Sequence, residues 1–272
     1  MKMVWLPPQH IYQHLYFHET FTIKVSEKQS FKMDHFGQQI ENELFWKGLD
    51  GGWEKRSIQL WKALCVDAKV IVDVGANSGL YSLVAKTISP QAEVYSFEPV
   101  NRVFNRLLKN NIINDFNIHT EEIALSNYDG EGIVYDTFDS HILSVTVNKN
   151  LHSPNITSHP VTISVKKLST YCIECKMAGI DLIKLDVETH EPEVLEGMDE
   201  LLIKFKPTLL IEVLNDEVAA RIQALVHNLN YLYFDIDENA GISQVNEIKK
   251  STGFNYLLCR ESVAQKLKLI NT

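Results

Sequence analysis

The sequence predicts an α/β fold in which a mostly parallel β-sheet is covered by helices on both faces. From about residue 69 onward, short and almost continuously apolar stretches alternate with stretches of helical pattern. Strands that are buried on both faces have such continuous apolar runs, and strands joined through helices are parallel. The composition, with 45% hydrophobic and 22% charged residues, is that of a globular protein rather than a disordered one.

The elements are expected in alternating order along the chain. The first strand is rich in the β-branched residues Val and Ile, and one helix begins near Pro192, which suits a first helical turn. The expected strands are Lys69–Val74, Glu93–Phe97, Asn117–Ile123, Asp181–Asp186, Thr208–Leu214, Tyr231–Asp235 and Asn255–Cys259. The expected helices are Leu80–Ile88, Asn101–Asn111, the stretch LSTYCIECKMAG (168–179), the helix from Pro192, and Asp216–Leu229.

Two regions depart from this alternation. Residues 1–55 form an aromatic-rich N-terminal appendage that holds three of the four tryptophans, and Phe21–Val25 within it is expected to be a strand. Residues from about 130 to 165 contain β-rich pieces and turn residues without a helical pattern, so we interpret them as an inserted hairpin or lid. The main domain is then expected over residues 56–272.

Charge and hydropathy exclude several classes of protein. The formal net charge of −9 argues against partners such as nucleic acids and anionic membranes, which attract an excess of Lys and Arg. No apolar run reaches the roughly 18 residues of a membrane span. The N-terminal residues lack the basic and apolar regions of a signal peptide, so we expect a cytoplasmic protein.

The cysteines do not indicate a metal or redox site. Cys172 and Cys175 form a C-x-x-C pair inside an expected helix. A zinc site would need a second such pair, and a redox pair would usually follow a strand at the start of a helix. We therefore expect reduced thiols.

The turn after the first strand, DVGANSG (73–79), suggests a ligand site. Glycine there lets the backbone turn sharply at the carboxyl end of a strand, where open α/β sheets bind ligands. A dinucleotide-binding turn would read G-x-G-x-x-G, but its second and third glycines are replaced by Asn77 and Leu80. Asp73, two positions before Gly75, would also repel a pyrophosphate.

The same turn is better suited to a cationic nucleoside. Asp73 suits a positive charge, and Glu98 at the end of the second strand is placed to accept hydrogen bonds from a ribose diol. A positive charge combined with a ribose indicates S-adenosylmethionine, which carries a sulfonium and an ammonium group. The alternative is that Gly75 and Gly79 only form a tight turn and that Glu98 is a solvated strand end.

A second group of polar residues follows the fourth strand. If the chain stays extended there, Asp186, Glu188 and His190 share one face, because the side-chain period of a strand is two. These groups could orient a substrate, remove a proton or, as a less favoured alternative, bind a divalent metal ion. Alternatively, Glu188 and Glu191 favour the start of the next helix and His190 caps it.

Glu212 is an unusual residue for its position. It lies in the apolar strand TLLIEVL (208–214), where a carboxylate is costly unless it is paired or functional. It could pair with Lys184 on the neighbouring strand, or it could belong to the same site as Asp186.

Three segments together resemble the FkbM family of S-adenosylmethionine-dependent methyltransferases. They are VIVDVGANSGLYSL (70–83), YSFEP (95–99) and DLIKLDVETHEPEVLEGM (181–198), and the resemblance covers roughly residues 54–215. It implies a Rossmann-like class I methyltransferase fold, with a seven-stranded sheet whose last strand is antiparallel. It also implies O-methylation of small molecules such as sugars or natural products, at a hydroxyl or carboxyl group.

The resemblance also implies roles for individual residues. The methionine end of the cofactor would be lined by Asp73, Gly75, Asn77 and Gly79, the ribose would be held by Glu98, adenine would be flanked by Glu122 and Ala124, and Glu54 resembles an acidic residue ahead of the first core helix. This chain departs from the family pattern at two places. Thr189 stands where glycine is common and would narrow the mouth of the site, and 168–170 read Leu-Ser-Thr instead of Leu-Asp-Asp.

Methyl transfer to a hydroxyl requires alignment of the reacting groups and removal of a proton. His190 is the first candidate for the base because an imidazole titrates near neutrality. Asp186 would orient it or contact the cationic end of the cofactor, and Glu188 or Glu212 is the alternative base.

The appendage contains a histidine repeat. On a helix, His10, His14 and His18 would share one face, but no carboxylate or cysteine accompanies them. We therefore favour a packing or gating role over metal binding. The aromatic residues of the appendage could cap the active site or form a homodimer contact.

Other functions remain as alternatives. One is an NAD(P)-dependent oxidoreductase, which Asn77 and Asp73 disfavour, and another is a non-catalytic interaction module that keeps the fold. Nucleic-acid methylation is disfavoured because the loop after the fourth strand reads Asp-Val-Glu-Thr, without the Pro-Pro-aromatic motif or a nucleophilic Cys.

Overall fold

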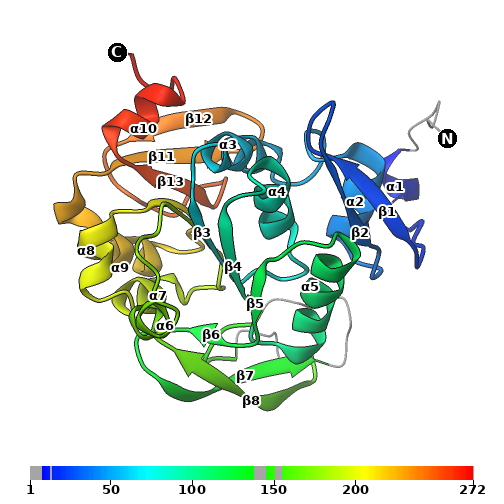
Figure 1. The fold of residues 1–272 in the computed structure, drawn as a ribbon, viewed down its shortest axis with the longest axis horizontal. Coiled ribbons are helices and arrows are strands. Elements are labelled where there is room, and N and C mark those ends of the chain that lie inside the picture. Colours follow the sequence, from blue (N-terminus) through cyan, green and yellow to red (C-terminus); the bar gives the residue numbers. More distant parts are fainter. Residues whose placement is uncertain (1–7, 13, 138–144, 151–154, 272) are drawn as a thin grey trace.

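The computed structural model describes residues 8–12, 14–137, 145–150 and 155–271. Its centre is a mixed sheet of eight strands with helices on both sides (Figure 1). In spatial order the strands are β12 (Gly241–Val245), β11 (Leu232–Asp237), β13 (Asn255–Cys259), β10 (Thr208–Glu212), β9 (Leu182–Leu185), β3 (Val70–Val74), β4 (Glu93–Phe97) and β5 (His119–Glu121).

The sheet confirms the predicted direction of its strands but not their number. The pairs β5–β4, β4–β3, β3–β9 and β9–β10 are parallel, and the last strand, β13, is antiparallel to both β10 and β11. The additional strand, β12, forms an antiparallel hairpin with β11 at the edge of the sheet. The expectation of seven strands is therefore corrected to eight among the described residues.

Alternate residues of each central strand contribute to two different cores. Ile71, Leu182 and Leu210 belong to one cluster of buried side chains, whereas Val72 and Ile183 belong to the other. This division follows from the period of two in a strand, and it explains why these strands are apolar throughout. The helices that cover the sheet and close the domain are α3 (Lys55–Cys65), α4 (Leu80–Ile88), α5 (Asn101–Ile113), α6 (Leu168–Glu174), α7 (Glu191–Glu196), α8 (Glu200–Phe205), α9 (Asp216–Val226), the 3₁₀ turn η1 (His227–Leu229) and α10 (Glu261–Lys266).

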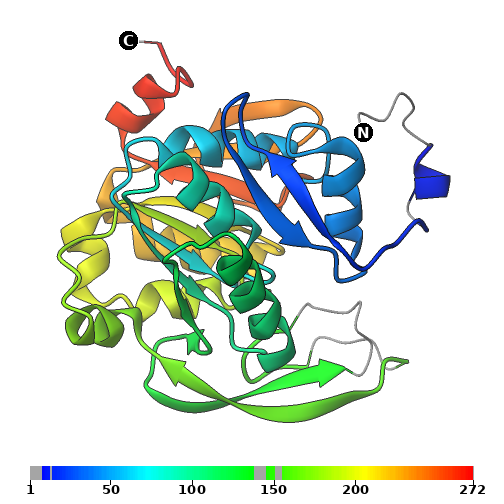
Figure 2. The ribbon, with the colours of Figure 1, turned by 45° about the vertical axis from the view of Figure 1, so that its right-hand side comes forward.

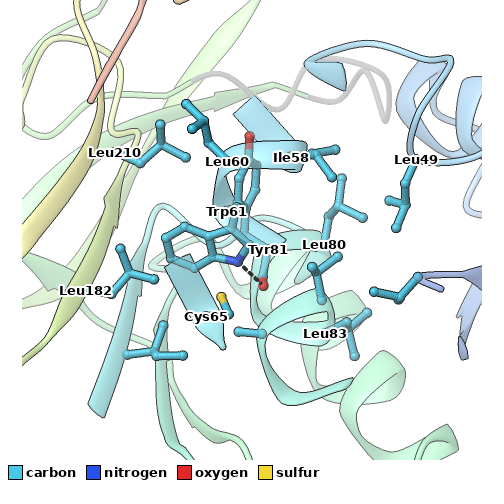
Figure 3. Packing of buried hydrophobic residues seen from close by; sticks show 14 of the residues in the cluster. Leu49, Ile58, Leu60, Trp61, Cys65, Leu80, Tyr81, Leu83, Leu182 and Leu210 are labelled. Atoms are coloured by element: carbon cyan, nitrogen blue, oxygen red, sulfur yellow. Dashed lines mark hydrogen bonds between the residues drawn. The ribbon is translucent and has the colours of Figure 1, made fainter. Parts of the chain in front are cut away.

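Trp61 joins α3 to α4 within the first core. Its side chain is fully buried, and its indole Nε1 donates a hydrogen bond to the carbonyl oxygen of Tyr81 at 2.9 Å (Figure 3). The two rings meet edge to face, with centroids 5.4 Å apart. Because Tyr81 also reaches the functional site described below, the packing of Trp61 helps to fix that site.

The N-terminal appendage packs into the same core. It consists of α1 (Gln9–Tyr12), the hairpin β1 (Thr20–Lys24) and β2 (Ser30–Asp34), and α2 (Gln39–Lys47). Its buried side chains, Phe21, Ile23, Phe31, Met33 and Leu44, belong to one cluster with residues of α3 and α4. Strand β2 lies against α4 and α5 (Figure 2).

The histidine repeat does not form a helical face. The helix α1 ends at Tyr12, and His14 and His18 are exposed in the non-helical segment that follows. The side chain of His10 lies outside the described part of the structure. The shared helical face, which was the less favoured possibility, does not form, because the helix ends before His14.

The insertion forms the predicted hairpin. Strands β7 (Gly130–Thr137) and β8 (Ser158–Lys166) pair antiparallel, and the short β6 (Ala124–Leu125) pairs with β8 in a separate three-stranded sheet. This sheet packs on α5 through Val100 and Val103. The strand predicted over 117–123 is shorter, because after β5 the chain leaves the main sheet and joins this smaller one.

Candidate active site

A cavity lies at the carboxyl edge of the central sheet. The strands β3, β4, β9 and β10 all end there, as expected for a ligand site in an open α/β sheet. Most of the residues predicted from the sequence line it, namely Glu54, Asp73, Gly75, Asn77, Glu98, Ala124, Asp186, Glu188, His190 and Glu212. Gly79 and Glu122 are not among the lining residues.

The turn after β3 requires its glycines. Gly75 has φ +77°, and a Cβ atom there would lie 1.8 Å from the carbonyl oxygen of Asp186. Gly79 has φ +93°, and a Cβ atom there would lie 2.6 Å from Cδ1 of Leu107. Gly75 therefore allows β3 and β9 to approach closely at the site, whereas Gly79 supports the turn from behind.

Glu98 is fixed by two backbone donors at the end of β4. One carboxylate oxygen accepts a hydrogen bond from the backbone N–H of Asn77 and the other from that of Val100, both at 3.0 Å. Glu98 is buried, and burial raises its pKa to about 7 in spite of these backbone donors. Each oxygen keeps a second lone pair, so the fixed carboxylate can still accept hydrogen bonds from a diol.

Asp73 lies deeper in the site. It is 1% exposed, and one carboxylate oxygen accepts a hydrogen bond from Oγ of Ser82 at 2.5 Å. Burial raises its pKa to about 6. The position supports the turn and leaves part of the side chain at the cavity wall.

One end of the cavity is apolar. Ala124 contributes to it, together with Val145 and Val147 of the insertion, which the sequence analysis did not identify as site residues. Glu122, predicted beside adenine, is instead exposed and accepts a hydrogen bond from Nδ2 of Asn101 at 2.9 Å. The chain turns between β5 and β6, so Glu122 faces solvent whereas Ala124, two residues later, is buried at the cavity.

The opposite end is charged, and Lys184 is at its centre. This lysine is 1% exposed, and its Nζ lies 3.0 Å from Oδ2 of Asp186 and 5.0 Å from the centre of the Tyr81 ring. Burial alone would lower the pKa of Lys184, but the carboxyl groups of Asp186, Glu54 and Glu212 raise it above its ordinary value. Sequence reasoning considered Lys184 only as an ion-pair partner; its signal is a lysine in an otherwise apolar strand.

Glu54 is close to this charged centre, as the resemblance implied. It is buried, and its two carboxylate oxygens accept hydrogen bonds from Tyr81 Oη and from Nδ2 of Asn255, both at 2.7 Å. Burial raises the pKa of Glu54. These contacts tie the appendage, α4 and β13 together around the site.

Glu212 has an incompletely satisfied side chain. Its Oε2 is buried without a hydrogen-bond partner. Burial, followed by the nearby charge of Asp186, raises its pKa to about 10. The positive charge of Lys184 lowers the pKa of Glu212, but it does not offset burial and the charge of Asp186, so the ligand-free fold favours the protonated side chain.

The loop after β9 is turned rather than extended. Glu188 has φ +53° and Thr189 has φ +76°, both in the left-handed region. Glu191 holds this loop, because its Oε1 accepts hydrogen bonds from the backbone N–H groups of Val187 at 3.0 Å and Thr189 at 3.3 Å. The extended chain considered from strand periodicity is therefore not found, although the loop still brings Asp186, Glu188 and His190 to the cavity. Thr189 does not line it.

His190 lies between the segment that follows β6 and the helix α7. Its Nε2 lies 2.9 Å from Oγ of Ser126, and its Nδ1 lies 3.7 Å from a carboxylate oxygen of Glu193. Burial lowers the pKa of His190, so the imidazole is neutral at pH 7. To act as a base through Nε2, it would first have to give up its contact with Ser126.

The structure gives no support for a metal site in its described residues. No three His, Cys, Asp or Glu side chains gather there as metal ligands, and Asp186, Glu188 and His190 are not such a group. Cys172 is buried, Cys175 is exposed, and both thiols are free. Within the same residues, no helix has the length and apolar character needed to cross a bilayer.

Comparison with known proteins identifies the family. Residues 73–233 match the family model of the methyltransferase FkbM domain. The chain belongs to this family. The resemblance predicted from the sequence is thereby confirmed, and with it the expectation of an FkbM-type methyltransferase domain.

Individual relatives match about half of the chain. Methyltransferase 1 of Beauveria bassiana is 28% identical over 49% of this chain and 60% of its own length. The 2-O-methyltransferase NoeI of Sinorhizobium fredii is 26% identical over 50% of this chain and 59% of its own. The 31-O-demethyl-FK506 methyltransferase FkbM of Streptomyces tacrolimicus is 27% identical over 48% and 60%, respectively. The chain thus matches about three fifths of the length of these relatives.

Proposed function

We propose that this protein is an S-adenosylmethionine-dependent O-methyltransferase that acts on a hydroxyl or carboxyl group of a small molecule. The observation that carries the proposal is one cavity with three parts in a row. It has an apolar end, the buried carboxylate of Glu98 and a carboxylate-rich end around Lys184. Adenine, ribose and the positively charged methionine part of the cofactor have the matching chemistry. The family membership supports the same cofactor.

The residues of the cavity suggest how the cofactor would be held. Ala124, Val145 and Val147 would surround adenine, and Glu98 would accept hydrogen bonds from the ribose hydroxyls. Asp186, which is paired with Lys184, would face the positively charged end. When bound, S-adenosylmethionine supplies an electrophilic methyl group on its sulfonium.

An oxygen acceptor is supported by the names of two relatives, one a 2-O-methyltransferase and the other acting on a 31-O-demethyl compound. We propose that Asp186 is the base that removes the proton from the acceptor oxygen. Its side chain is 24% exposed, lines the cavity and is held by Lys184. His190 is contacted by Ser126, so we propose that it positions the loop; Glu188 is the alternative base. The acidic net charge favours a small acceptor over a nucleic acid.

Calorimetry with S-adenosylmethionine and with NAD separates this proposal from an oxidoreductase. We expect binding of the former and none of the latter. Asp186→Asn should lower kcat about 100-fold or more if Asp186 is the base, because general-base catalysis contributes about 10²–10⁴-fold. His190→Ala should lower it less. Failure to bind S-adenosylmethionine would exclude the proposal, and binding without methylation of any acceptor would favour a non-catalytic module.

A further inference from the structure

A second cavity adjoins the carboxylate-rich end of the first. The two cavities share Trp53, Glu54 and Glu212. The rest of the wall is formed by residues 237–239, at the end of β11 and in the turn after it, and by residues 252–255, which lead into β13. Since β13 is antiparallel to β10 and β11, its beginning lies at the same sheet edge as their ends. The second cavity is therefore beside the place where the methyl group would be transferred.

The described wall of this cavity carries acidic groups and no basic ones. Its carboxyl groups are those of Glu54, Glu212, Asp237 and Glu238, and no Lys, Arg or His is among its lining residues. Two of these carboxylates are fixed by backbone donors. Asp237 accepts from the N–H groups of Asn239 and Ala240 at 2.8 and 2.7 Å, and Glu238 accepts from those of Arg56 and Ser57 at 2.6 and 3.1 Å. Asp237 and Glu238 are therefore fixed in position, and a cation that entered the cavity would also favour the ionised forms of Glu54 and Glu212, whose pKa values burial raises.

Two buried oxygen atoms on this wall have no hydrogen-bond donor. Asn255 is 2% exposed; its Nδ2 donates to Glu54, whereas its Oδ1 has no partner. Oε2 of Glu212 is buried and unpartnered as well. An unsatisfied buried acceptor costs about 1–3 kcal/mol. Both atoms are closed to solvent in the structure, and a donor group that reached them would recover part of that cost.

Two aromatic side chains are exposed at the cavity. Trp53 is 51% exposed and Phe254 is 39% exposed, although both are large and apolar. Phe254 also has φ +57°, an uncommon conformation for a bulky residue. Aromatic faces near carboxylates attract organic cations through the ring quadrupole.

We propose that the second cavity binds the part of the acceptor next to the methylated oxygen, and that this part carries a protonated amine. An ammonium group donates three hydrogen bonds and is positively charged, so it satisfies both unpartnered oxygens and the acidic wall. An acceptor with a phosphate or carboxylate at this position would be repelled. The inference rests on the proposed function, since it assumes that methyl transfer occurs in the adjoining cavity.

Matched acceptors provide the test. Isotopically labelled S-adenosylmethionine is incubated at pH 7 with amino alcohols and amino sugars, including 2-aminocyclohexanol and glucosamine, and with their N-acetylated counterparts. We expect labelled O-methyl products from the amines, with kcat/KM at least tenfold above that of the neutral counterparts. Preference for the neutral or an anionic acceptor, methylation on nitrogen, or no methylation of any amine would overturn the proposal. Calorimetry with S-adenosylmethionine is done first, so a failure of cofactor binding is recognised separately.

A pair of phenylalanine variants locates the effect. Phe254→Ala should raise KM for the methylated amine at least fivefold and leave the Kd of S-adenosylmethionine within twofold. Phe45→Ala is the matched control, because Phe45 is similarly exposed at 38% but lines neither cavity. Weaker cofactor binding with an unchanged acceptor KM in Phe254→Ala would mean that the cavity holds the cofactor, and the proposal would be wrong.

Discussion

Gly75 and Asp186 lie against each other where the two chain segments that build the site meet. The missing side chain of Gly75 allows the turn after β3 to lie against the carbonyl group of Asp186. This contact joins the expected cofactor turn to the loop that carries the proposed base. A single methyl group at this position would separate the two.

We therefore expect Gly75→Ala to weaken both the fold and cofactor binding by displacing the turn. The new Cβ would lie 1.8 Å from Asp186 O, so the turn must shift. The cost is about 1–3 kcal/mol of folding stability, together with a loss of S-adenosylmethionine affinity of about tenfold or more. Thermal unfolding and calorimetry measure the two effects.

Gly48→Ala is the control for backbone strain alone. Gly48 has a similar φ of +70°, but nothing lies within 4 Å of a Cβ placed there. This variant should lose some stability and keep its cofactor affinity. Equal losses of affinity in both variants would mean that contact with Asp186 is not what matters.

At the same scale, the sequence predicted residues whose roles follow from chain order. Gly75 and Glu98 were identified correctly as cavity residues because each lies directly after a strand of the sheet. Glu122 was placed in the cavity by the resemblance, but the turn between β5 and β6 exposes it. The importance of Lys184 could not be predicted, because it depends on which carboxylates the fold brings around it.

Among the elements, the insertion has a direct connection to the end of the cavity where we propose that adenine binds. Val145 and Val147 line the apolar end of the cavity, next to Ala124. The hairpin is attached to α5 by Arg102, whose Nε and Nη2 donate to the Asp136 carboxylate at distances from 2.6 to 3.1 Å. The insertion therefore belongs with the apolar end of the cavity.

Asp136→Asn should weaken cofactor binding without affecting the acceptor. Loss of the charge-assisted, two-point contact between Arg102 and Asp136 costs about 1.5–3 kcal/mol. Because this contact holds the insertion on α5, the insertion should pack more loosely at the cavity. We expect the Kd of S-adenosylmethionine to rise about 3- to 10-fold, measured by calorimetry, with little change in acceptor KM. Asp129→Asn is the control, because Asp129 accepts from Lys167 N and Thr170 Oγ1 near the other end of the hairpin. An acceptor effect in place of a cofactor effect would contradict this assignment.

The elements that the sequence predicted well are those buried on both faces. Strands β3, β4 and β13 and helix α4 agree with the expected bounds to within one residue. The strand β12 was missed because Gly241–Val245 is partly exposed at the edge of the sheet and has no continuous apolar run. The helices α8 and α10 were not predicted, because each has only six residues and is too short to show a clear helical period in its apolar side chains.

For the whole molecule, the acidic composition has a structural meaning. Several carboxyl groups are buried close to the sheet edge, among them Glu98, Glu191 and Glu212. Their burial has an energetic cost that a positively charged ligand would reduce. The appendage shares the first core with α3 and α4 and contributes Ile40 and Trp53 to the cavity, so this site is not built from the main domain alone.

These buried carboxyl groups predict that the ligand-free protein loses stability as the pH rises from 6.5 to 8.5. Burial raises the pKa of Glu98 to about 7, of Glu191 to about 8 and of Glu212 to about 10, from an ordinary value of 4.5. Between the ordinary and the raised pKa the folded protein binds more protons than the unfolded chain, so stability falls as the pH increases. His190, with its lowered pKa, acts in the opposite direction mainly below pH 6.5. Urea unfolding at several pH values should show that the free energy of unfolding falls by on the order of 1 kcal/mol per pH unit for each extra proton that the folded protein binds.

Glu191→Gln identifies the contribution of one carboxyl group. The amide keeps the oxygen that accepts hydrogen bonds from Val187 and Thr189, but it does not titrate. Below pH 8, the slope of unfolding free energy against pH should become smaller by an amount that corresponds to up to one bound proton. Saturating S-adenosylmethionine should reduce the decrease in the unmodified protein, because its positive charge favours the ionised carboxylates. Stability that rises from pH 6.5 to 8.5, or a cofactor effect that is largest at the lower pH, would show that these groups are already ionised in the ligand-free fold.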